Sequence, residues 1–133
     1  MSAAPQLETR PEVAVVGGLA GFPSSERFAL DEVVEGGPLF RLSSLDEEGL
    51  EFVVAPPGVF FPDYSPVIDD ASVQRLGLTG EQDALVLVVL TLGATAREAT
   101  ANLLAPLVIN QRDGIAAQVV VEGTYPLRAP LQS

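Results

Sequence analysis

ALVLVVLTL, residues 84–92, is the stretch that decides the fold, because every residue in it except one threonine is apolar. This run is far shorter than the ~20 apolar residues of a membrane span. Its aliphatic and β-branched composition predicts a central strand that is buried on both faces. The next apolar stretch, residues 102–110 (NLLAPLVIN), predicts another strand with a bulge or an edge position at Pro106, since proline cannot donate to a sheet ladder. An Asp-Gly pair at 113–114 then indicates a tight turn, so we expect residues 115–121 (IAAQVVV) to return as the hairpin partner.

The N-terminal half contains several short apolar runs separated by turn residues. Residues 39–43 (LFRLS) alternate apolar and polar side chains, and residues 51–54 (EFVV) follow an acidic turn, which together predict a second hairpin. Shorter runs at 13–16 and 27–30 are expected to be strands, with an acidic loop over 31–37. The protein should therefore be rich in short strands.

Helix signals are concentrated in one short segment. Asp69 can cap the first turn of a helix, apolar residues follow three apart, and Gly77 occupies the position of a C-terminal cap. Six to eight short strands with one or two short helices predict a mainly β fold, a small antiparallel β-barrel or roll. We expect residues 1–11, which contain two prolines, to be a flexible N-terminal arm, and residues 12–133 to be a single β-barrel-like domain.

The charge is strongly negative. The chain has 18 acidic residues and 7 basic ones, all arginine, which gives a formal net charge of −11. Such a chain repels phosphate, so no direct binding to nucleic acid is expected. A basic protein partner is one interpretation of this charge, and solubility alone is the other. Because the sequence shows no secretion signal and no membrane span, we expect a cytoplasmic protein with no membrane partner.

The inventory of catalytic side chains is poor. The chain lacks histidine, cysteine and lysine, which excludes Ser-His pairs, thiolate chemistry, Schiff bases and imidazole or thiolate metal ligands. Two groups of carboxylates remain, and neither matches the calcium-loop pattern. They are interpreted as a helix cap and a solvated turn. We therefore expect no catalysis, no metal and no cofactor. The two groups are Asp63, Asp69 and Asp70, and Glu47, Glu48 and Glu51.

One local concentration of aromatic residues lies between prolines, at Phe60, Phe61 and Tyr64. The proline interruptions predict a shaped loop or an edge segment. Aromatic residues dominate binding hot spots, but phenylalanine is often simply part of the core. We expect Phe61 in the core, and Tyr64, beside Asp63, as an exposed contact.

Seven segments in a fixed order resemble the bacterial flagellar assembly factor FliW family, from about Val13 to Arg128. The most diagnostic segment is residues 100–110, and the first segment has Ala20 where the family has proline. The segments are Gly18-Leu19-Ala20-Gly21-Phe22, Pro38-Leu39-Phe40, Phe52-Val53-Val54-Ala55-Pro56, Phe61-Pro62-Asp63-Tyr64, Leu76-Gly77-Leu78, residues 100–110 (TANLLAPLVIN) and Tyr125-Pro126-Leu127-Arg128.

The resemblance implies a β-barrel-like fold, no enzymatic activity and two protein partners. One partner is cytoplasmic flagellin and the other is CsrA, the RNA-binding regulator that represses flagellin translation. In the family's scheme, flagellin export frees the assembly factor, which then binds CsrA and relieves the repression. The resemblance also implies partner-surface positions at Asp63, Tyr64, Asn102 and Asn110. The two asparagines have a second interpretation, which is that they satisfy backbone groups at strand ends.

Two other functional classes stay open at this point. A β-barrel can enclose a small molecule such as a flavin, although no basic cluster is present to bind a phosphate. A structural or export component of the flagellum is the third possibility.

Overall fold

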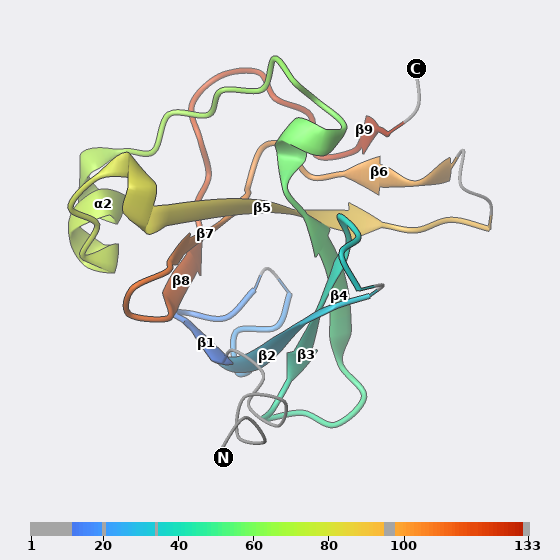
Figure 1. Cartoon of the computed structure of the whole chain (residues 1–133), viewed down its shortest axis with the longest axis horizontal. Helices are drawn as coiled ribbons and strands as arrows, with labels where there is room; N and C mark the ends of the chain where they lie inside the picture. The colour runs from blue at the N-terminus through green and yellow to red at the C-terminus, as the bar shows by residue number, and fades with distance from the viewer. Residues whose placement is uncertain (1–11, 20, 34, 95–97, 132–133) are drawn as a thin grey trace.

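The computed structural model describes residues 12–19, 21–33, 35–94 and 98–131; the arm expected over 1–11 lies outside the described residues. Within that part of the chain the elements are almost all short strands (Figure 1). The expected mainly β fold is confirmed. In chain order the elements are β1 (Glu12–Val15), β2 (Arg27–Glu32), β3 (Phe40–Ser44), β4 (Glu51–Ala55), the 3₁₀ turn η1 (Pro57–Val59), helix α2 (Asp70–Leu76), the 3₁₀ turn η2 (Glu81–Asp83), β5 (Ala84–Thr91), β6 (Thr100–Ala101), β7 (Leu107–Asn110), β8 (Ile115–Gln118) and β9 (Ala129–Pro130).

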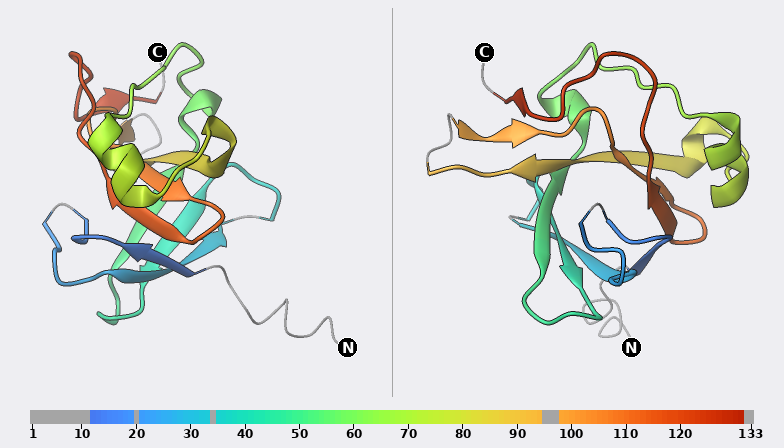
Figure 2. Two further views of the ribbon diagram at one scale, coloured as in Figure 1. Left: turned by 90° about the vertical axis from the view of Figure 1, so that its left-hand side faces the viewer. Right: turned by 180° about the vertical axis from the view of Figure 1, so that it is seen from behind.

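The sheet closes on itself. Strands β4, β3, β2, β1, β8, β7 and β5 are hydrogen-bonded in that order, and a further pairing of β4 with β5 completes a seven-stranded barrel. The pairing of β1 with β8 is parallel, and every other neighbouring pair of the described strands is antiparallel. Strands β6 and β9 extend the sheet beyond the second half of β5, on the side opposite to α2 (Figures 1 and 2).

Strand β5 has apolar contacts on both faces, as its sequence predicts. Leu87 points into the barrel interior, where it belongs to the main core cluster. On the other face Val86 packs beneath α2, and Val88 packs against the segment that includes β6 and β9. The strand ends at Thr91, which is exposed. This one strand therefore joins the three core clusters that the described residues form.

The barrel interior is filled by side chains. Its core is aliphatic, as expected, except for Phe28, which is fully buried and meets Phe52 edge to face at a centroid distance of 6.2 Å. The buried members of this cluster are Val13, Val15, Leu19, Phe28, Leu42, Val54, Leu87, Leu107, Ile109 and Ala116.

Helix α2 begins and ends where the sequence predicts. Asp69 caps it by accepting hydrogen bonds from the Ser72 hydroxyl (2.7 Å) and the Ser72 backbone N–H (3.1 Å), and these two bonds hold the pKa of Asp69 below its ordinary value. Gly77 ends the helix in the left-handed conformation, with φ of 70°. Leu76 then packs in one buried cluster with Val108 of β7 and Ala117 of β8, so the helix covers the outside of that hairpin.

The expectation of one strand over 102–110 is wrong. Strand β6 ends at Ala101 and β7 begins at Leu107, with Pro106 immediately before it rather than in a bulge. The loop between the two strands is not paired as a strand, and its backbone groups form other hydrogen bonds. Strand β8 also ends three residues earlier than expected, and residues 119–121 instead donate two backbone hydrogen bonds to this loop.

Two smaller differences concern β2 and the Asp-Gly turn. Strand β2 continues to Glu32, which pairs with Phe40, so the acidic loop expected over 31–37 starts two residues later. The β7–β8 hairpin forms as predicted, with Asn110 opposite Ile115, but its turn comprises the four residues 111–114. Gly114 has a φ of 72°, which is the conformation that favours glycine.

Candidate partner-binding groove

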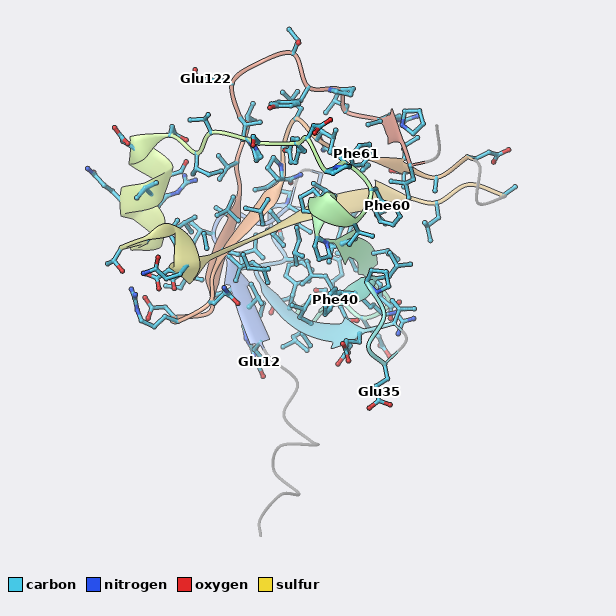
Figure 3. All side chains as sticks on the ribbon, turned by 45° about the horizontal axis from the view of Figure 1, so that its top comes forward. Glu12, Glu35, Phe40, Phe60, Phe61 and Glu122 are labelled. Carbon is cyan, nitrogen blue, oxygen red and sulfur yellow. The ribbon has the colours of Figure 1, made fainter. Side chains whose placement is uncertain are left out.

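A shallow groove lies between three loops beside β6 and β9. Its volume is about 380 Å³. Figure 3 shows Phe60 and Phe61 on the loop that follows η1, well separated from Phe40 on β3. We call this feature the aromatic groove, and its lining consists of Phe60, Phe61, Pro62, Asp63, Tyr64, Leu103 and Tyr125.

The loop over 60–64 is held in a defined shape by its own backbone. Two prolines end β4, and η1 starts at the second of them, Pro57. The Pro57 carbonyl accepts hydrogen bonds from Phe60 N (3.0 Å) and Phe61 N (2.7 Å), and Tyr64 N donates to the Phe61 carbonyl (3.0 Å). The sequence prediction of a shaped loop is confirmed.

The two tyrosines of the chain meet in this groove. Their rings are perpendicular, with a centroid distance of 4.9 Å between Tyr64 and Tyr125. The Tyr64 hydroxyl donates to the Leu103 carbonyl at 2.6 Å, and the Tyr125 hydroxyl donates to the Ser65 carbonyl at 3.4 Å. Burial, and secondarily the neighbouring Tyr125, raises the pKa of Tyr64 to about 12. Tyr64 is thus a half-buried, neutral donor that fixes the groove, rather than the exposed contact that we expected.

Phe61 also differs from its expected place. It is half-buried, packing against the cluster of β4, β5, β6 and β9 with one side and lining the groove with the other. It is thus part core and part surface, an arrangement that aromatic side chains at interfaces commonly adopt.

Asp63 supplies the charge of the groove. Its side chain is exposed, and within the described residues its carboxylate has no hydrogen-bond or ion-pair partner. Among the described residues that line the groove, none has a basic side chain. The groove therefore combines open aromatic surface with one unpaired negative charge, a combination that suits binding rather than catalysis.

Asn102 stabilises one of the loops that form the groove. Its side-chain oxygen accepts hydrogen bonds from Leu104 N (3.1 Å) and Ala105 N (2.9 Å), which fixes the loop after β6 and so positions Leu103 in the groove. The second interpretation of Asn102, that it satisfies backbone groups at a strand end, is confirmed.

Asn110 is not on the surface. It has no exposed area, and its amide donates to the Leu76 carbonyl (2.8 Å) and to the Asp113 carboxylate (3.2 Å). Its oxygen accepts from Arg112 N (2.9 Å) and Asp113 N (3.1 Å). Asn110 joins the end of α2 to the β7–β8 turn, so its second interpretation, that it satisfies backbone groups at a strand end, is confirmed, and its position is buried rather than on a partner surface.

Asp63 and Tyr64 thus both line the aromatic groove, Asn102 fixes the loop that contributes Leu103 to it, and Asn110 lies elsewhere. Sequence reasoning missed Leu103 and Tyr125 as groove residues. Tyr125 offered one signal, since it begins the last of the ordered segments, and nothing in the sequence pairs it with Tyr64.

Other surface features differ from the groove in composition. A cavity of about 280 Å³ near the end of the barrel has mixed apolar and polar walls that include Asn102 and Arg128. Acidic residues are spread over the molecule, and Figure 3 shows Glu35 and Glu122 on opposite sides of it. Within the described residues, carboxylates do not gather in groups of three that could bind a metal ion. In the same part of the chain, no helix has the length and apolar character needed to cross a membrane.

Comparison with known proteins gives a consistent result. The family model described as "FliW protein" matches residues 4–131. The flagellar assembly factor FliW of Bacillus licheniformis is 33% identical over 127 residues, covering 95% of this chain and 89% of the relative. That of Treponema pallidum is 35% identical over 117 residues, covering 88% and 77%. A crystal structure of the flagellar assembly factor FliW superimposes with a TM-score of 0.84 at 34% identity, covering 91% of this chain and 85% of the other.

Proposed function

The chain belongs to the FliW family, and from that premise we propose that it is a cytoplasmic flagellar assembly factor with two protein partners. It binds flagellin before export, and it binds the translational regulator CsrA and relieves the repression of flagellin translation. The observation that supports this proposal most strongly is the similarity to proteins named flagellar assembly factors along nearly the whole chain.

The geometry favours a protein that acts through its surface. Within the described residues, buried side chains pack together in the middle of the barrel, and the cavity near its end has a volume of only about 280 Å³. The aromatic groove, in contrast, is preformed and open, as binding hot spots are. We therefore assign partner binding to the face that contains Asp63 and the two tyrosines.

Relief of repression has an electrostatic explanation. Negative charges that lie within a Debye length of an RNA path, about 8 Å at physiological salt, weaken RNA binding without occupying the RNA site. Glu47 and Glu48 are suited to this role, because both are exposed on the β3–β4 turn and neither has a carboxylate interaction within the described residues. Neighbouring Asp46 differs, because its carboxylate accepts hydrogen bonds from Arg27 N and Glu26 N, both at 3.0 Å.

A mixing experiment with purified components tests the proposal. The protein is combined with flagellin and, separately, with CsrA bound to a flagellin message, and complex formation and RNA release are measured independently. The double change Glu47→Gln and Glu48→Gln should preserve CsrA binding and weaken RNA release. Asp69 is unsuitable for such a test because it caps α2, whereas Asp70 is exposed and its neutralisation provides a second charge variant.

Two results would count against the proposal. Absence of binding to both proteins would refute the assignment of partners. RNA release that is unchanged in every charge variant would refute the electrostatic explanation alone.

The alternatives predict different measurements. A flavin-like ligand would give the purified protein a visible absorbance and an excess native mass, and the cavity near the end of the barrel would be its place. A structural component of the flagellum would fractionate with the filament rather than with the cytoplasm.

A further inference from the structure

We propose that the aromatic groove binds a basic side chain of the partner, an arginine or a lysine that is flanked by apolar residues. The inference rests on the proposed function, because it specifies the chemistry of the partner segment that the groove accepts.

The walls of the groove are suited to a cation. Four of the eight aromatic residues of the chain line it, namely both tyrosines, Phe60 and Phe61. All four are half-buried, so part of each ring is covered by protein and part is open to the groove. The open face of an aromatic ring attracts ammonium and guanidinium groups, and guanidinium groups also stack on it.

The negative charge of the groove also favours a cationic side chain. Asp63 is the one charged residue in its lining, and within the described residues no cation neutralises it. The formal net charge of −11 adds a long-range attraction for a basic segment and repels an acidic one. Charge complementarity therefore identifies the occupant as cationic.

The volume of the groove and its apolar lining residues determine which residues can flank the basic side chain. About 380 Å³ is at the low end of the range of small-molecule sites, roughly 300–1,000 Å³, so the groove accommodates one or two side chains. Pro62 and Leu103 supply apolar surface beside the aromatic rings. An apolar neighbour of the basic residue would cover this surface, whereas a run of charged residues would leave it in water.

The sequence provides a reporter for occupancy of the groove. The chain has no tryptophan, and both of its tyrosines line the groove, so its tyrosine emission comes entirely from this site. We would titrate the whole protein with a capped pentapeptide that has arginine between two leucines. Matched peptides would carry citrulline, which is a neutral analogue of arginine, or glutamate in place of the arginine.

Asp63→Asn is the test variant. Because the Asp63 carboxylate has no partner within the described residues, the fold should tolerate this change, and a urea titration would verify it. Glu35→Gln is the matched control, because it removes one negative charge from an exposed position outside the groove.

We expect the arginine peptide to bind about five- to tenfold more tightly than the citrulline peptide, with the glutamate peptide weakest. Asp63→Asn should reduce the advantage of arginine to about twofold or less, and Glu35→Gln should leave it nearly intact. Equal binding of the three peptides, equal effects of the two variants, or no emission change at millimolar peptide would overturn the inference.

Full-length partners separate this inference from the proposed function. If flagellin and CsrA bind the protein but an excess of the arginine peptide and Asp63→Asn leave that binding unchanged, the inference fails and the proposed function stands. If neither full-length protein binds while the peptide series shows the expected order, the assigned partners are wrong and the chemistry of the groove is right.

Discussion

Replacement of Asn110 by alanine should destabilise the protein without removing a partner contact. The change deletes one donor to the buried Leu76 carbonyl and one acceptor of two turn N–H groups, from Arg112 and Asp113. A buried polar group left without a partner costs about 1–3 kcal/mol. The Leu76 carbonyl bears that full penalty, while the turn N–H groups belong to exposed residues and can bind water. With the lost packing included, we expect a loss of about 2–4 kcal/mol.

Urea and thermal unfolding measure this loss. The entropy of unfolding is about 2.1 cal/mol/K per residue, which is about 0.3 kcal/mol/K for 133 residues. The expected loss therefore lowers the melting temperature by about 7–13 °C. Asn102→Ala is the comparison, since its half-buried side chain accepts two backbone hydrogen bonds and its removal should cost less, about 1–2 kcal/mol.

Two results would contradict a purely structural role of Asn110. If Asn110→Ala changes the stability by less than about 0.5 kcal/mol, the range of an ordinary surface substitution, the buried network has no structural role. If the same variant also lost binding to flagellin or CsrA, the position would be a partner contact after all.

Three further predictions follow from local geometry. Gly18→Ala should destabilise by about 1–3 kcal/mol, because φ is +71° and the new Cβ would clash with the Phe22 carbonyl oxygen. Gly36→Ala, with φ of +75° and open space around it, should cost less in the same urea titration. Spectrophotometric titration should show one tyrosine that ionises near pH 12, and this transition should be absent from Tyr64→Phe. The stabilisation that depends on neutral Tyr64 is complete below a pH of about 10 and is lost as the pH rises through about 12. Because the pKa of Asp69 is lowered in the folded state, its stabilisation is present above the unfolded pKa of about 3.9 and is lost as the pH falls through the folded value, so Asp69→Asn should weaken the acid dependence of the urea midpoint.

Local signals made part of the fold predictable. Helix α2 is specified within nine residues, from the cap at Asp69 to Gly77, so no distant contact was needed to place it. The β7–β8 hairpin is similar, since the residues that pair are close in sequence. Closure of the barrel is different, because β1 pairs with β8 and β4 pairs with β5 across long separations that no local pattern encodes.

The same distinction explains the outcome for the site residues. Asp63 and Tyr64 could be predicted as candidate site residues because aromatic residues and prolines cluster around them in sequence. Leu103 is 39 residues from Tyr64, and only the fold brings the two together. Asn110 stands at the end of an apolar strand, where a polar side chain can face solvent or turn inward. The Asn110 side chain turns inward because the end of α2 offers it a hydrogen-bond acceptor, and the sequence around Asn110 does not predict that α2 ends there.

The closed barrel also limits how a partner can be recognised. An unpaired strand edge allows a partner to add a strand through main-chain hydrogen bonds. Closure removes the free edges of the barrel strands, and the extension beyond β5 ends at the two-residue strand β9, which contains Pro130 and so lacks one N–H donor.

If a strand were nevertheless added at β9, Asp63→Asn and Tyr64→Phe would change the affinity for full-length partners little, because main-chain bonds would dominate. If side chains of the groove provide recognition, both substitutions should weaken binding. Tyr64→Phe should act chiefly on the dissociation rate, because it releases the Leu103 loop that the free protein holds in place.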